Sequence, residues 1–317
     1  MCSAVSKAEK QHIRSRLISS SIDEPHAQLA VQNAVIIAKV ARTEYPLEWP
    51  KVFTDITTII RQSSQATANG QHDEQATLHL TRSLSILLHV VKELATGRLS
   101  RTKSNLQSIT PEVLKVLGDV YIGNVQVWQG LLGQQPVPEV AVQTMNISLL
   151  ALKIMRRLMV CGYEFPNRAP EVSQAWTIFQ QHLWSFYSAE TEIIASDDVA
   201  KMLKKHIVHI GKLFLDVSSS HPAAFGLLPN TLELLSKYWE VVVGHGERLV
   251  AQGKKTASGI SGGDGEIEET EQEVTRREFR EKIALQGMLL FRGCIKMVYH
   301  PTSTFKCTSP VLAEVEC

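Results

Sequence analysis

The feature that most constrains the fold is a pattern of apolar residues at helical spacing, which recurs along nearly the whole chain. Residues 73–96 show it clearly, because their apolar side chains return every three or four positions: Leu80, Leu84, Leu87, Val91 and Leu94. Similar patterns predict further helices over 7–20, 25–44, 49–65, 110–133, 139–161, 170–189, 198–217, 229–251 and 275–298. No segment alternates apolar and polar residues as a strand would. The sequence therefore predicts an all-α fold.

The connections between these helices indicate how the helices are arranged. Most are short and polar or contain proline or glycine, which favours antiparallel helix pairs stacked in an array. HEAT-type repeats are about 40–47 residues long, and the irregular spacing here implies insertions. One is the polar connector 63–76. The other is the glycine-rich and acidic segment 253–274, which is expected to be disordered because it lacks apolar residues to bury.

Composition and charge exclude several classes of protein. The chain has 317 residues, 44% of them hydrophobic, and a net charge of +1, which does not indicate a nucleic-acid or acidic-membrane partner. No apolar run reaches the roughly 18 residues of a membrane span, and the N-terminus lacks the apolar core of a secretory signal. The five scattered cysteines favour reduced thiols in the cytosol or nucleus over a disulfide framework: Cys2, Cys161, Cys294, Cys307 and Cys317.

The segment 37–53, IAKVARTEYPLEWPKVF, predicts an abrupt corner between two helices. Pro46 disfavours helical geometry in the residue before it, so the first helix should end near Tyr45. Pro50 suits the first turn of the next helix, where its missing N–H is not needed. Trp49 is expected to be buried between the two helices, and tryptophans Trp176 and Trp239 are expected to fill the core elsewhere.

This corner resembles a signature of the importin-β (karyopherin-β) family of nuclear transport receptors, in which a helix ends at an acidic residue followed by Tyr-Pro and the next begins at Trp-Pro. Here the motif comprises Tyr45, Pro46, Trp49 and Pro50, and Glu44 stands where many members have aspartate. Three further segments resemble the family, the first two of them its importin eleven-like branch: LLHVVKELATGRL (87–99), LLALKIMRRLMVCGYEFP (149–166) and VYHPTSTFK (298–306).

The resemblance implies a right-handed HEAT-repeat α-solenoid that acts as a nuclear import receptor. Such a receptor binds protein cargo and Ran-GTP, contacts FG-repeat nucleoporins weakly through its outer helices, and shuttles between cytoplasm and nucleus through the nuclear pore. It implies a monomer without cofactor, direct nucleic-acid binding, membrane insertion or enzymatic activity. The alternatives are a HEAT-repeat scaffold or adaptor without Ran dependence and, less in keeping with the residues, an enzyme.

The resemblance also divides the chain. Residues 1–22 correspond to the end of the second repeat, in the family's N-terminal domain, and 23–252 to HEAT repeats. The disordered loop 253–274 precedes a further HEAT helix at 275–306, and 307–317 is unlike the family. The chain is therefore expected to be a fragment without the first and the C-terminal repeats, either through a truncated or mis-spliced gene model or as a genuine short form.

Two charged clusters are candidates for contact with partners. Lys153, Arg156 and Arg157 lie on an apolar helix and could contact acidic cargo or the GTPase, or could simply extend over apolar surface into solvent. The acidic run that contains Glu268, Glu269 and Glu271 could contact basic cargo or form a solvated linker.

Motifs for catalysis or metal binding find little support. The sequence GISGG at 259–263 matches a nucleophile elbow, but that motif needs a preceding strand and a following helix. His206 and His209 are three residues apart on one predicted helix, and a zinc site would need two further ligands, which no paired His/Cys motif supplies. We therefore predict no catalytic, cofactor or metal site.

Overall fold

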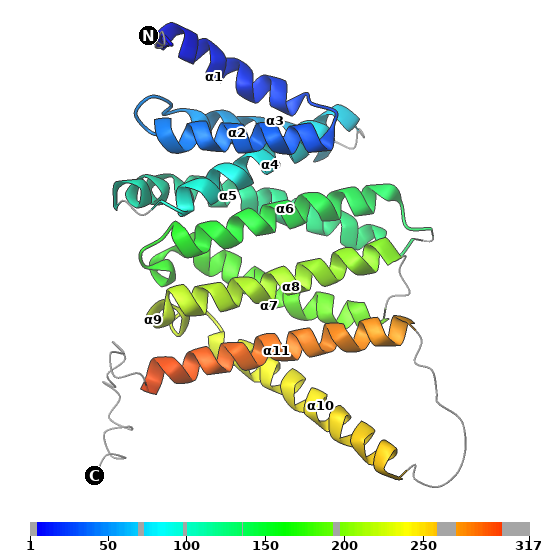
Figure 1. Ribbon diagram of the computed structural model, residues 1–317. Coiled ribbons are helices and arrows are strands. Elements are labelled where there is room, and N and C mark those ends of the chain that lie inside the picture. The colour runs from blue at the N-terminus through cyan, green and yellow to red at the C-terminus, as the bar shows by residue number, and fades with distance from the viewer. Residues whose placement is uncertain are drawn as a thin grey trace. The chain divides into compact units, whose positions relative to one another are not determined.

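The computed structural model describes residues 5–68, 73–97, 100–134, 136–192, 197–258 and 271–299, and their regular elements are all helices. The elements, shown in Figure 1, are α1 (Lys7–Ile22), α2 (Ala27–Glu44), α3 (Val52–Ala68), α4 (Glu74–Ala95), α5 (Ser100–Leu131), α6 (Glu139–Cys161), the short 3-10 helix η1 (Pro166–Arg168), α7 (Pro170–Glu192), α8 (Asp197–Ser220), α9 (Pro222–Phe225), α10 (Thr231–Ser258) and α11 (Glu271–Tyr299). The predicted all-α, helical-repeat fold is confirmed. Within these ranges, no helix combines the length and the apolar character that a membrane crossing requires.

The chain forms two compact units. The first comprises Met1–Glu164 together with Glu192–His206, and the second comprises Phe165–Thr191 together with Ile207–Cys317. The long helix α8 contributes its first part to the first unit and its remainder to the second.

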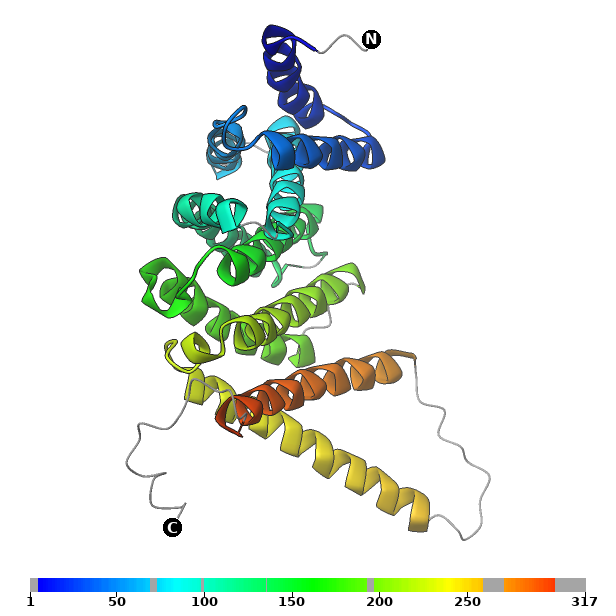
Figure 2. The ribbon, with the colours of Figure 1, turned by 60° about the vertical axis from the view of Figure 1, so that its left-hand side comes forward.

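In the first unit, α4 packs against both α2 and α3, and α5 and α6 form a closely packed pair. Figure 2 shows these helices from a second direction. The core between them consists of fully buried aliphatic side chains, among them Ile37, Ile56, Leu80, Leu87 and Leu152. Burial of such side chains, at about 1.5–3 kcal/mol each, is the main force that holds the helices together.

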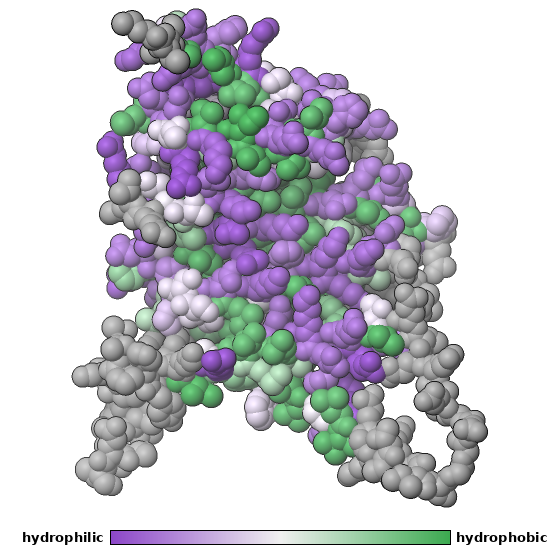
Figure 3. Space-filling view, viewed as in Figure 1, coloured by the Kyte–Doolittle hydropathy of each residue, from purple (hydrophilic) through white to green (hydrophobic). Residues whose placement is uncertain are grey.

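The outer face of α2 remains apolar and open in the described part of the chain. Leu29, Val31, Val35 and Ile36 are all at least 37% exposed. Figure 3 shows the resulting group of hydrophobic side chains, in green, over α2.

The start of α1 agrees with the prediction because a capping box defines it. The Ser6 hydroxyl oxygen accepts a hydrogen bond from the Glu9 amide at 3.2 Å, and the Glu9 carboxylate accepts one from the Ser6 amide at 2.8 Å. These bonds satisfy two backbone donors that a helix start otherwise leaves without partners. The bond from the Ser6 backbone is also the main reason that the pKa of the Glu9 carboxyl is lowered.

The predicted start of a helix at Thr110-Pro111 is wrong, because both residues lie inside α5, which begins at Ser100. Thr110 does not cap a helix: its hydroxyl donates to the Leu106 carbonyl at 2.7 Å, one turn earlier. Leu106 and Thr110 are both buried, so packing favours a helix that continues through Pro111 despite the missing N–H. Tertiary contacts here outweigh a local stop signal.

In the second unit, aromatic side chains fill the space between α7, α8 and α9. The Trp176 ring is fully buried and meets the Phe214 ring edge-on at 4.7 Å and the Phe225 ring at 5.7 Å. Farther along, the Trp184 ring packs on Tyr238 of α10 at 5.1 Å. The expectation that Trp176 is a core residue is confirmed.

The same expectation for Trp239 is wrong. Its side chain is 58% exposed and contacts the Phe291 ring on α11 at 5.7 Å. The buried face of α10 instead carries Leu234 and Tyr238, each 1% exposed. The apolar pattern of this segment covers more than one face of the helix, so periodicity alone could not identify the side that packs.

The helices that flank the predicted loop at 253–274 extend farther than expected. α10 continues to Ser258 and α11 begins at Glu271, so 253–258 and 271–274 are helical rather than part of a disordered segment. Residues 259–270 of the predicted loop and the predicted tail 307–317 lie outside the described residues.

Candidate functional site

The predicted corner between α2 and α3 is present. α2 ends at Glu44, and Tyr45 has an extended backbone with ψ 138°, as expected for a residue before proline. The Tyr45–Pro46 peptide bond is cis. The Trp49 amide donates to the Glu44 carbonyl at 3.1 Å, which closes the turn.

The predicted burial of Trp49 is confirmed, because its side chain is only 5% exposed. The predicted position of Pro50 is wrong. α3 begins at Val52, so Pro50 lies in the turn ahead of the helix rather than in its first turn. The Tyr45 ring meets the Phe53 ring edge-on at 5.1 Å. One aromatic contact, between a ring before the two prolines and a ring after them, therefore joins the two sides of the corner.

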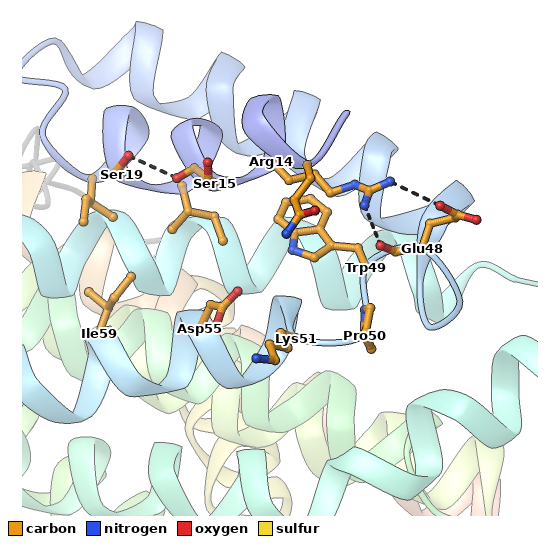
Figure 4. A pocket seen from close by; sticks show the side chains of 12 residues that line it. Arg14, Ser15, Ser19, Glu48, Trp49, Pro50, Lys51, Asp55 and Ile59 are labelled. Atoms are coloured by element: carbon orange, nitrogen blue, oxygen red, sulfur yellow. Dashed lines mark hydrogen bonds and ion pairs between the residues drawn. The ribbon is translucent and has the colours of Figure 1, made fainter. Parts of the chain in front are cut away.

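Arg14 of α1 binds this corner through an ion pair and a hydrogen bond. Its Nε lies 2.6 Å from the Glu44 Oε2. Its Nη1 donates to the Glu48 carbonyl at 2.6 Å, and Figure 4 shows Arg14 beside Glu48. The Arg14 and Glu44 side chains are only 12% and 17% exposed. A charge pair so little solvated is screened less than a surface pair. The partners are 30 residues apart, and no sequence pattern joins them.

An open groove of about 620 Å³ lies beside the corner, between α1 and the beginning of α3. Figure 4 shows its side chains. Ile18, Trp49 and Ile59 provide apolar lining, and Lys51 and Asp55 add charges. Partial burial raises the pKa of the Asp55 carboxyl, although Lys51 opposes the shift.

The predicted basic cluster lies on the second half of α6. The side chains of Lys153, Arg156 and Arg157 are all partly buried, which fits both the contact with a partner and the extension over apolar surface. Of the acidic candidates, Glu268 and Glu269 lie outside the described residues. Glu271 is the first residue of α11, and its side chain is not described. The structure therefore does not bring the basic and acidic candidates together.

His206 is a core residue. Its ring is fully buried and lies 5.8 Å from the Trp128 ring. Its Nδ1 donates to the Met202 carbonyl at 2.9 Å, and its Nε2 lies 2.9 Å from the Ser148 hydroxyl oxygen. Among the residues whose side chains are described, no group of three or more His, Cys, Asp or Glu could hold a metal ion.

Comparison with known proteins gives the sequence relatives of this chain. No family profile matches the sequence. The chain is 26% identical over 301 residues to the importin beta-like protein KAP120 of Saccharomyces cerevisiae. This match covers 93% of this chain and 25% of KAP120. The chain is 29% identical over 254 residues to Importin-11 of Homo sapiens, covering 78% of this chain and 24% of that protein. The chain thus spans about a quarter of the length of these relatives.

A solved structure shows the same fold. It is described as Lph2, a bidirectional nuclear transport receptor of S. cerevisiae, and it superimposes with a TM-score of 0.74 at 24% identity over 100% of this chain and 28% of that one. The predicted resemblance to the importin-β family, including its importin eleven-like branch, is confirmed by these relatives.

Proposed function

We propose that this chain is a segment of an importin-β-family nuclear transport receptor, which binds protein cargo and Ran-GTP and carries the cargo through nuclear pores. The observation that carries the proposal is the similarity to an importin beta-like protein over 93% of the chain. The helical-repeat fold and its match to a nuclear transport receptor agree with it. The receptor would shuttle between cytoplasm and nucleus.

The mechanism that we propose is binding alone. Cargo lies along a face of the helical array, and Ran-GTP favours a form of the array with lower affinity for cargo. Such coupling is reciprocal and amounts to about 1–3 kcal/mol in allosteric systems generally. Helix arrays suit this role because each repeat contacts only its neighbours, so small changes at each interface add up along the chain. Contacts with FG-repeat nucleoporins would use apolar side chains that remain exposed on the helices.

A pull-down from nuclear extract with the immobilised chain tests the proposal. Bound proteins should be released when Ran loaded with a non-hydrolysable GTP analogue is added, and Ran-GDP is the matched control. A HEAT-repeat scaffold without Ran dependence would retain the same proteins under both conditions. That outcome would exclude the transport role for this chain in favour of the scaffold.

A further inference from the structure

The helix α10 has a packed first part, residues 231–243, and a distal part, residues 247–258, that differs from it in burial. In the first part, Leu234 and Tyr238 are each only 1% exposed. In the distal part, the side chains that the structure describes, those of 247–251, are all exposed. Burial therefore stabilises the first part of α10 and contributes little to the described side chains of the distal part.

The neighbouring helix α11 contacts the packed part of α10 closely. A Cβ at Gly287 of α11 would come within 3.0 Å of the Tyr238 ring and 3.1 Å of the Val242 side chain. Toward the C-terminal end of α10 the two helices diverge, as both Figure 1 and Figure 2 show. No hydrogen bond or ion pair joins the described side chains of 243–251 to another helix. Beyond Val242, the described interactions of α10 are therefore mainly those within the helix itself.

Two glycines lie where the packed part of α10 ends. Gly244 and Gly246 are inside the helix, and a Cβ at either position would meet nothing within 4 Å. No neighbouring group therefore requires a glycine at either position. Glycine weakens the interior of a helix because it loses more backbone freedom on folding than alanine does. The helix is thus weakest at the same point at which its tertiary packing ends.

We propose that Gly244 and Gly246 form a hinge, at which the distal part of α10 opens while the packed part stays folded. Opening breaks helical hydrogen bonds of the distal part but uncovers none of the buried side chains described above. Local opening of this kind costs far less free energy than unfolding of a whole unit. The distal part can then change its direction without disturbing the core around Tyr238. This hinge does not depend on Ran binding or on the transport role proposed above.

The test is amide hydrogen exchange of the 317-residue chain, followed by mass spectrometry. The amides of 249–258 donate to carbonyls at 245–254, so they report on the part beyond the hinge. The amides of 235–243 report on the packed part. The amides of 249–258 should exchange at least about tenfold faster than those of 235–243, with a step near the glycines.

Gly244→Ala and Gly246→Ala should each slow the exchange of 249–258 by about fourfold, because alanine favours the closed helix. Gly118→Ala on α5 is the matched control, since a Cβ there also meets nothing within 4 Å, and it should leave 249–258 unchanged. Trp176→Leu removes a fully buried ring from the core of the same unit. It should speed the exchange of 235–243 but not that of 249–258, because opening at the hinge leaves that core intact.

Three outcomes would overturn the proposal. The first is exchange at one rate across 235–258, or a gradual rise toward Ser258 without a step. The second is exchange of 249–258 that neither alanine substitution in α10 slows. The third is faster exchange of 249–258 in Trp176→Leu, which would show that the distal part opens only when the unit unfolds. The comparison within the unaltered chain decides the question even if a variant fails to fold.

Discussion

At the scale of single residues, burial separates tryptophans that the sequence treats alike. Trp49 is 5% exposed beside the corner, whereas Trp239 is 58% exposed on α10. Large-to-small substitutions cost stability in proportion to the contacts and the cavity involved. The two residues therefore form a matched pair for measuring what the corner contributes.

Trp49→Ala should lower the free energy of unfolding by about 3–5 kcal/mol, because it removes a buried aromatic side chain and leaves a cavity. Trp239→Ala should cost much less, since more than half of that side chain is already in water. Urea denaturation followed by circular dichroism measures both. Equal losses in the two variants would show that Trp49 does not hold the corner together.

His182 on α7 predicts a dependence of stability on pH. Burial lowers its pKa from 6.5 to about 4 in the folded protein, and its ring stacks on Phe186 at 5.1 Å. The unfolded chain takes up a proton near pH 6.5 and the folded chain only near pH 4. This residue's contribution is therefore fully present above pH 6.5 and is lost as the pH falls toward 4, by about 3 kcal/mol in total.

His182→Gln removes that titration, so the variant should lose less stability than the unaltered chain between pH 7 and pH 4. His12→Gln is the control, because His12 is exposed on α1. Melting temperatures across this range give the comparison. Parallel curves for His182→Gln and the unaltered chain would contradict the assignment.

At the scale of elements, the contact between α5 and α6 depends on a glycine. Gly162 ends α6, and a Cβ at this position would overlap the side chain of Thr110 and come within 2.7 Å of the Leu158 carbonyl oxygen. Thr110 is the residue at which the sequence predicts a helix to begin, and it is buried inside α5. The end of α6 therefore approaches α5 closely at this point.

Gly162→Ala should destabilise the chain by about 1–3 kcal/mol, as overpacking in a core usually does. Gly118→Ala on α5 is the matched control, since a Cβ there meets nothing within 4 Å. That control should be neutral or should stabilise by up to about 1 kcal/mol, because alanine favours the helix interior. Thermal denaturation distinguishes the two. A neutral Gly162→Ala would show that the helices can separate at no cost.

At the scale of the whole molecule, the helical-repeat architecture predicts that a destabilising substitution affects only the helices near it. Each repeat contacts only its neighbours, so stability is close to a sum of local terms. Trp49→Ala should therefore speed hydrogen exchange in α1 to α3 and leave α10 and α11 unchanged. Hydrogen–deuterium exchange with mass spectrometry measures this helix by helix. A uniform increase across the chain would indicate one cooperative unit instead.

The sequence by itself determined the helical class, the limits of a helix such as α6 and the burial of Trp49. These depend on periodicity, proline geometry and capping, which are interactions between residues near each other in the chain. The importin-β resemblance also rests on such local motifs.

Only the tertiary structure decided the continuity of α5, the exposed side of α10 and the Arg14–Glu44 pair. Each of these depends on which helix faces fit together across distant parts of the chain. A local sequence pattern does not contain that information. Burial can outweigh the local preference of a capping residue or a proline, but only where another helix packs against the segment and buries it.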